Sequence, residues 1–91
     1  MKIYEWDSEK NIKLKEERGL SFEEVVFYLE RNDVLDVMPH PNRAKYPNQR
    51  IFVLNIDGYV YLVPFVERDN TVFLKTIIPS RKATKKYIER Q

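Results

Sequence analysis

The residues best suited to chemistry lie near the end of the chain, in the stretch TIIPSRKATKKY at positions 76–87. An apolar run ends there at a proline and a serine, and four cations and a phenol follow: Arg81, Lys82, Lys85, Lys86 and Tyr87. Amides at a helix N-terminus attract anions, so Arg81 and Lys82 at the start of a helix predict a phosphate-binding site. A basic helix face that is merely solvated is the competing interpretation.

Two residues outside this stretch are further candidates. Arg50 follows a proline-rich loop and could bind phosphate through two parallel hydrogen bonds, which a lysine cannot do. Its alternative role is an ion pair with Asp57 or Glu67. His40 is the only histidine, which excludes cleavage of a phosphodiester by a pair of histidines. Because it lies between two prolines in a loop, we expect a structural or exposed side chain, with a catalytic role as the alternative.

The composition excludes several other kinds of site. The chain has no cysteine, so it forms no disulfide and no zinc site that needs thiolates. Gly19 and Gly58 are the only glycines, too few for a glycine-rich phosphate loop or a dinucleotide fingerprint. Asp33 and Asp36 are near one another, but no histidine–carboxylate group joins them. We therefore predict neither a metal nor a cofactor.

Length and charge suggest one domain with a polyanionic partner, and the absence of cysteine and of a signal-peptide or membrane-spanning pattern suggests the cytoplasm. The 91 residues fit a single domain, 1–91, and no apolar run is long enough to span a membrane. The net charge of +2 is unevenly distributed along the chain. Residues 1–37 contain ten acidic and six basic side chains, whereas residues 38–91 contain four acidic and ten basic ones. A positive second half suits a polyanion, although surface charge alone is also compatible with plain solvation.

The N-terminal third predicts two helices, with a short edge strand formed by Ile3, Tyr4 and Trp6 ahead of them. Asp7 is a suitable N-cap for a helix over residues 8–18, with Ile12 as its main apolar contact. Gly19 is typical of a helix end. Ser21 and Glu24 then form a capping-box pattern for a second helix that fades near residues 32–33. Its inward positions at helical spacing are Phe22, Val25, Val26 and Leu29.

The remainder predicts strands and a last helix. Residues 34–38 suggest a strand with Val34 or Leu35 turned inward, and residues 39–49 a loop rich in proline. Dense β-branched and aromatic residues, with a hairpin turn at Asp57–Gly58, predict an antiparallel meander over 50–56, 59–66 and 71–78. Pro64 indicates a bulge or bend. With a helix over 81–89 capped by Ser80, the fold class is α+β: two N-terminal helices, three or four strands and a C-terminal helix.

The chain resembles the BrnT family of toxins from type II toxin–antitoxin systems over roughly residues 4–88. The similarity lies in YEWDSEKNIKLKEERGLSFEE, in QRIFV and in KTIIPSRKATKKY, three segments in the family's order. The resemblance implies a RelE-like fold, endoribonuclease activity and a dedicated BrnA-like antitoxin encoded beside the toxin, with which it could form a hetero-oligomer. It also places Arg50 and Arg81 at arginines of the family pattern, with Lys82 and Lys85 on its basic helix.

Three departures from the family pattern concern this site. Thr76 occupies the position of an arginine before Ile-Ile, with Lys75 one step earlier. Pro79–Ser80 replaces Ser-Ala, and Arg18–Gly19 replaces His-Gly. Loss of a phosphate ligand at Thr76 affects the expected catalytic efficiency and not the expected fold.

The mechanism expected for such a ribonuclease uses no metal, because the 2′-OH of RNA itself attacks the phosphorus. Arg50 and Arg81 are expected to converge and stabilise the charge on the phosphate. Lys82 or Lys85 would position the RNA backbone or exchange a proton. Tyr87 would supply a phenol, stack on a nucleobase or belong to the core. The expected further RNA contacts are Lys75, Lys86, Arg43 and Lys45. The alternative function is a non-catalytic basic module that binds nucleic acid or an acidic partner.

Overall fold

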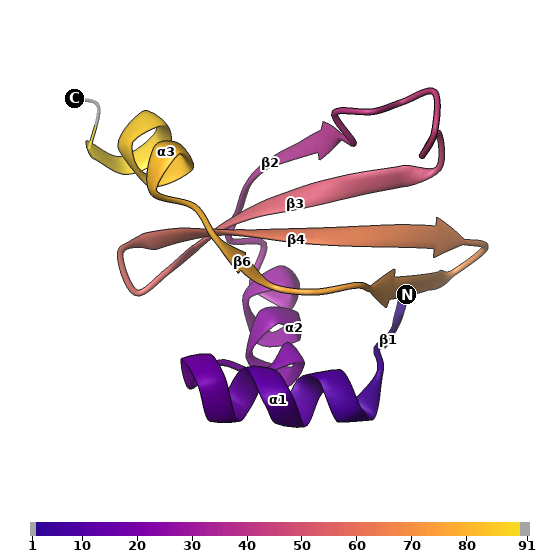
Figure 1. Cartoon of the computed structure of the whole chain (residues 1–91), viewed down its shortest axis with the longest axis horizontal. Coiled ribbons are helices and arrows are strands. Elements are labelled where there is room, and N and C mark those ends of the chain that lie inside the picture. Colours follow the sequence, from indigo (N-terminus) through magenta and orange to yellow (C-terminus); the bar gives the residue numbers. More distant parts are fainter. Residues whose placement is uncertain (1, 90–91) are drawn as a thin grey trace.

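The computed structural model describes residues 2–89, which form a mixed six-stranded sheet with helices on both faces (Figure 1). The N-terminal half contains β1 (Ile3–Glu5), α1 (Ser8–Arg18), α2 (Phe22–Glu30) and β2 (Val34–Pro39). The second half contains β3 (Gln49–Ile56), β4 (Tyr59–Arg68), β5 (Thr71–Leu74), β6 (Ile78–Pro79) and α3 (Arg81–Thr84), which continues into the π-helical turn η1 (Lys85–Glu89). The predicted α+β class is confirmed. No helix in residues 2–89 is long and apolar enough to cross a membrane.

The sheet order is β1-β5-β4-β3-β2, with β6 beside β4. The meander β2–β3–β4–β5 is antiparallel as predicted, and the leading strand β1 pairs in parallel with β5. The hairpin between β3 and β4 turns at Asp57 and Gly58, whose φ angles of 54° and 86° both lie in the left-handed region. This turn is the one that an Asp-Gly pair favours.

The third meander strand is shorter than predicted, and Pro64 causes no bulge. The register between β3 and β4 continues without interruption through the Ile51–Pro64 pair. The Pro64 carbonyl accepts a hydrogen bond from the Lys75 amide at 2.8 Å. The Pro64 nitrogen, which has no proton to donate, therefore faces the side of β4 on which β5 has already ended. After β5, the Ile77 side chain is fully buried and the Ile77 carbonyl accepts a hydrogen bond from the Arg18 side chain at 2.6 Å. These contacts direct the chain away from a continued strand.

The caps of the two N-terminal helices are those that the sequence predicts. Asp7 accepts from the amides of Glu9 and Lys10, and Gly19 ends α1 with φ 66°. Ser21 and Glu24 form the reciprocal capping box of α2. These local bonds satisfy amides that a helix start leaves without partners.

The predicted inward face of α1 is wrong. Ile12 is 57% exposed, whereas Leu14 and Asn11 are buried. Asn11 is inside because its side chain bonds α2: its oxygen accepts from the Phe22 amide at 2.7 Å and its nitrogen donates to Glu23 at 2.8 Å. A polar side chain with two such partners is stable at a buried position.

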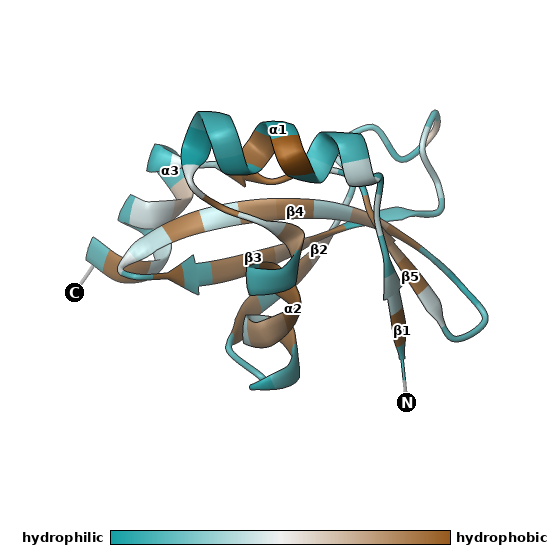
Figure 2. Ribbon diagram, turned by 90° about the horizontal axis from the view of Figure 1, so that it is seen from below, coloured by the Kyte–Doolittle hydropathy of each residue, from teal (hydrophilic) through white to brown (hydrophobic). Residues whose placement is uncertain are grey.

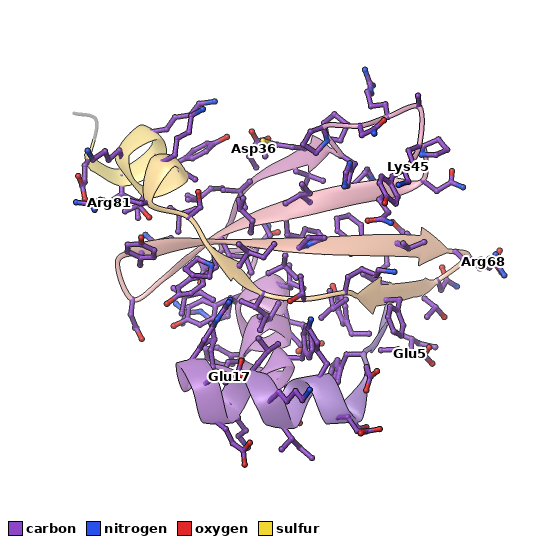
Figure 3. The ribbon with its side chains drawn as sticks, viewed as in Figure 1. Glu5, Glu17, Asp36, Lys45, Arg68 and Arg81 are labelled. Atoms are coloured by element: carbon purple, nitrogen blue, oxygen red, sulfur yellow. The ribbon has the colours of Figure 1, made fainter. Side chains whose placement is uncertain are left out.

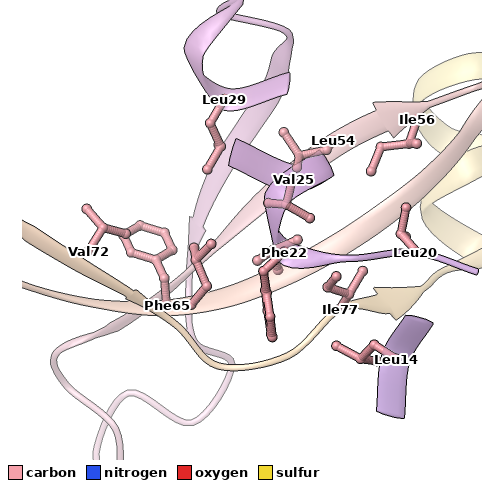
Figure 4. Packing of buried hydrophobic residues seen from close by; sticks show 12 residues of the cluster. Leu14, Leu20, Phe22, Val25, Leu29, Leu54, Ile56, Phe65, Val72 and Ile77 are labelled. Carbon is pink, nitrogen blue, oxygen red and sulfur yellow. The ribbon is translucent and has the colours of Figure 1, made fainter. Parts of the chain in front are cut away.

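The main core lies between these helices and one face of the sheet. Figure 4 shows α2 side chains Phe22 and Val25 packing against Phe65, Leu54 and Ile77. Hydropathy follows the same arrangement, because β3 and β4 are mostly apolar along their middle while α1 is hydrophilic apart from a short band (Figure 2). Of the two candidates on β2, Val34 is half-buried against this core and Leu35 is 41% exposed.

A buried hydroxyl and the backbone of the N-cap residue attach the C-terminal helix to β4, where the Ser80 amide donates to the Val60 carbonyl at 3.0 Å. Ser80 caps α3 as predicted, accepting from the Ala83 amide at 3.1 Å. Thr84 donates to the Ser80 carbonyl at 2.7 Å and accepts from the Val60 amide at 2.8 Å. The helical region covers the predicted residues, but only its first four are α-helical.

Candidate nucleic-acid interface

Arg50 lies on the face of the sheet that the N-terminal helices cover. It is the register partner of Phe65, and directly opposed residues project to the same face of a sheet. Phe65 belongs to the core under α2, and the Arg50 guanidinium carbon lies 5.1 Å from the centre of its ring. Arg50 also donates to Glu67 at 2.8 Å, and Lys2 pairs with the same carboxylate. The ion pair that the sequence offered as an alternative is therefore the arrangement found.

The C-terminal helix lies on the other face. Leu62 is three residues before Phe65 on β4, so its side chain projects to the opposite side. It lines a pocket of about 270 Å³ together with residues of β2, α3 and η1: Met38, Ser80, Lys82, Ala83, Lys86 and Tyr87. Side chains of the last helix and of the outer strand thus meet over this face, which we call the α3 face.

The expected convergence of Arg50 with Arg81 is wrong. Arg50 projects from the face that the N-terminal helices cover. It is also displaced along the sheet, because it lies opposite Phe65 of β4, whereas β6, which leads into α3, pairs with Tyr61 and Leu62. The four residues of β4 between these positions correspond to about 13 Å. The sequence could not reveal this, because strand parity and the face chosen by the last helix are set by tertiary packing.

The helix cations divide into two neighbouring stripes. Lys82 and Lys86, four residues apart, line the pocket, while Arg81 and Lys85 are exposed on the adjacent stripe. Figure 3 shows Arg81 on the side of the helix turned away from Asp36. Within residues 2–89 none of these four cations forms an ion pair with a carboxylate. The Lys86 ammonium lies 5.3 Å from the centre of the Tyr87 ring.

Tyr87 contacts a residue that the sequence did not assign to the site. Its hydroxyl donates to Asp36 Oδ2 at 2.8 Å, and this hydrogen bond, with smaller contributions from burial and from the Asp36 charge, raises the pKa of Tyr87. In the sequence, Asp36 was considered only for a metal site, which was not predicted. A signal was present, because an acidic residue interrupts the otherwise apolar strand sequence VLDVM. Its partner lies 51 positions away, and no local pattern could identify it.

The remaining candidates lie apart from the last helix. Lys45 is at the far end of the molecule from Arg81, in the loop between β2 and β3 that also contains Arg43 (Figure 3). Lys75 is exposed and follows β5. In the same loop as Lys45, His40 accepts from the Asn42 amide at 3.0 Å and its ring lies 4.5 Å from that of Tyr46, so its contacts are those of a structural residue. No group of three or more His, Asp or Glu side chains within residues 2–89 is arranged to hold a metal.

The fold and this surface define a small α+β protein whose last helix carries four cations on its exposed side. The family model described as ribonuclease toxin, BrnT, of type II toxin–antitoxin system matches residues 6–86. The chain therefore belongs to the BrnT family of ribonuclease toxins, as its motifs suggested. Membership implies an RNA substrate and an antitoxin partner. No solved structure and no curated protein sequence matched the chain.

Proposed function

We propose that this chain is an endoribonuclease toxin that cleaves RNA without a metal on its α3 face and is neutralised by a BrnA-like antitoxin. The observation that supports the proposal is the set of cations on α3 and η1, which lie beside a pocket and lack acidic partners within residues 2–89. Like charges at such spacing repel one another, and a bound phosphate chain relieves that repulsion.

The proposed chemistry begins with attack by the 2′-OH on the neighbouring phosphorus. Negative charge then accumulates on the phosphate, and stabilisation of that charge usually contributes more to the rate than any other effect. Lys82 and Lys86 bind the reacting phosphate from the pocket, and Arg81 and Lys85, on the adjacent stripe of the helix, bind the neighbouring phosphate of the RNA chain. Arg50 has no part in this proposal, because Glu67 and the Phe65 ring hold it on the other face.

The remaining cations serve RNA binding in this proposal. Lys75 extends the positive surface from the end of β5, and Arg43 and Lys45 provide a second cationic point in the loop between β2 and β3. Contacts of this kind add affinity that does not depend on the base sequence and that decreases as salt rises.

The proposed antitoxin contact is the same face of the sheet. Phe73 is the register partner of Val66 and Ile78 that of Leu62, so both project to the α3 face. They are 37% and 42% exposed, respectively. An antitoxin segment that combines apolar with acidic residues matches this surface in both respects, and it would exclude RNA from the helix cations.

The deciding experiment incubates the purified protein with RNA in the presence of a chelator. We expect wild-type protein to cleave RNA, to leave DNA of the same sequence intact and to stop when the protein encoded by the adjacent reading frame is added. Arg81→Ala should lower the cleavage rate by on the order of 100-fold or more and abolish growth inhibition, because it removes a phosphate ligand. Lys13→Ala, an equal charge change on exposed α1, is the matched control and should cleave normally.

The outcomes separate the two candidate functions. Wild-type protein that shifts RNA in a gel and leaves it intact would identify a binding module. Cleavage by Arg81→Ala at the wild-type rate, with circular dichroism showing both proteins folded, would reject the assignment of the site.

A further inference from the structure

The contact between η1 and the outer strand β2 has a geometry suited to proton transfer. The Tyr87 hydroxyl donates to Asp36 Oδ2 at 2.8 Å, and the Val37 amide donates to Asp36 Oδ1, also at 2.8 Å. Both carboxylate oxygens are therefore occupied, which fixes the orientation of the group. The register shift between Val34 and Asp36 lies immediately before this residue. Bulges commonly redirect a side chain in this way.

The phenol connects this carboxylate to the cationic pocket. Tyr87 lines the pocket of about 270 Å³ together with Lys82 and Lys86. Because its proton is directed at Asp36, the phenol oxygen retains a lone pair that can accept a further hydrogen bond. Tyr87 also lies in a π-helical turn, a distortion that occurs frequently at functional sites.

Tyr87 cannot act as a base without a proton acceptor. The hydrogen bond to Asp36 raises its pKa above the ordinary value of 10.0, so the phenol is protonated at neutral pH. It can take a second proton only if it releases its own at the same time. The carboxylate that receives its hydrogen bond is the acceptor already in place.

We propose that Asp36 is a positioning residue of the cleavage site, which orients Tyr87 and takes up the proton that Tyr87 releases. The inference rests on the proposed function. As the 2′-oxygen forms its bond to phosphorus, its proton moves to the Tyr87 oxygen and the Tyr87 proton moves to Asp36. The bond from phosphorus to the 5′-oxygen breaks, and that oxygen takes a proton from the ammonium of Lys82 or Lys86. The products are a 2′,3′-cyclic phosphate and a 5′-hydroxyl, and exchange with water restores the side chains.

The test compares Asp36→Asn, Asp36→Glu and Tyr87→Phe on a short RNA, with rates measured under single-turnover conditions. Asparagine retains an oxygen that can accept the Tyr87 hydrogen bond and loses the ability to take a proton. We expect Asp36→Asn and Tyr87→Phe each to lower kcat by on the order of 100-fold, with KM close to that of wild-type protein. Asp36→Glu should recover part of the rate.

The pH–rate profile gives a readout that a purely structural contact would not change. Protonation of Asp36 removes the acceptor, so wild-type protein should lose activity as pH falls, and Asp36→Asn should lose this acidic limb. Asp36 contacts the Tyr87 phenol, which lines the pocket together with Lys82 and Lys86, and its register partner on β3 is the uncharged Val53.

The outcomes distinguish this inference from the function on which it rests. Wild-type kcat and an unchanged acidic limb in Asp36→Asn, alongside an inactive Arg81→Ala, would overturn the role of Asp36 and leave the nuclease intact. Wild-type protein that cleaves no RNA would overturn both. If Asp36→Asn fails to fold, Tyr87→Phe decides, because its ring still fills the same place: full activity in that variant rejects the relay.

Discussion

The two faces of the sheet each bury a polar side chain, and they use it differently. On the face covered by α1 and α2, Asn11 satisfies the amide of Phe22 at the start of α2, inside a core of buried apolar residues. On the α3 face, Thr84 satisfies the amide of Val60 beneath a helix whose other side chains are mostly charged. The first bond joins two helices that carry the stability of the domain. The second bond attaches the cationic last helix to β4 of the sheet.

The difference shows how a domain of this size separates folding from binding. The N-terminal helices have reciprocal caps and a continuous apolar contact with the sheet. The C-terminal helix has four α-helical residues and one π-helical turn, and its exposed residues include Arg81 and Lys85. An isolated helix so short is unstable in water. Its position therefore depends on contacts with the sheet, among them the Thr84–Val60, Ser80–Val60 and Tyr87–Asp36 hydrogen bonds.

Removal of the polar bond on the stable face should have the largest effect on folding. Asn11→Leu retains the size of the side chain and leaves the Phe22 amide buried without a partner, so we expect a loss of about 2–3 kcal/mol in the free energy of unfolding. Urea unfolding followed by circular dichroism measures it. Ile12→Ala, on the same helix and 57% exposed at that position, is the control and should change stability little. Equal losses in the two variants would contradict the assigned role of Asn11.

The corresponding change on the α3 face should be smaller and local. Thr84→Val is close in shape and removes the hydroxyl, so the Val60 amide and the Ser80 carbonyl lose a partner at a cost of about 1–2 kcal/mol. We expect faster amide hydrogen exchange in residues 81–89 while the amides of α2 keep their protection.

Thr84→Ser supplies the control for this comparison, because it retains the hydroxyl. It should exchange more like wild-type protein. Uniform loss of protection over the whole chain in Thr84→Val would show that the last helix belongs to the same cooperative unit as the core, and the separation of the two faces would not hold.

The parts of the fold that could be predicted from sequence are those set by neighbouring residues. Asp7, Gly19 and the Ser21–Glu24 pair mark helix ends through bonds that span at most four positions. The turn at residues 57–58 depends on the backbone freedom of Asp-Gly. Such signals operate within one turn of chain and need no knowledge of the rest.

The site was predicted less well because its geometry depends on distant residues. Ile12 was expected to be the main apolar contact of α1, but Asn11 is buried instead because the start of α2 lies against it. Arg50 and Arg81 were grouped by charge, although strand parity places Arg50 beside Glu67 on the other face. The Asp36–Tyr87 pair requires β2 and η1 to be adjacent, which only the complete sheet determines.

The smallest predicted effect is the dependence of stability on pH, which should have opposite signs for the two faces of the sheet. The hydrogen bond from Asn11 is the main cause that lowers the pKa of Glu23 below its ordinary value of 4.5. Its stabilising contribution is present above that value and is lost as pH falls through the lower pKa of the folded state. Tyr87 behaves oppositely: its raised pKa gives a contribution that is present below pH 10.0 and lost as pH rises through the folded-state pKa.

Acid should therefore weaken the contact between α1 and α2, and alkali the contact between η1 and β2. Glu23 is exposed to solvent, so its share after screening should be roughly 0.5 kcal/mol or less. Urea unfolding of wild-type protein and Glu23→Gln between pH 7 and about pH 3 measures that share, since only wild-type protein should lose it with acid. Parallel pH curves for the two proteins would mean that the bond from Asn11 to Glu23 contributes nothing, and that Asn11 acts through the Phe22 amide alone.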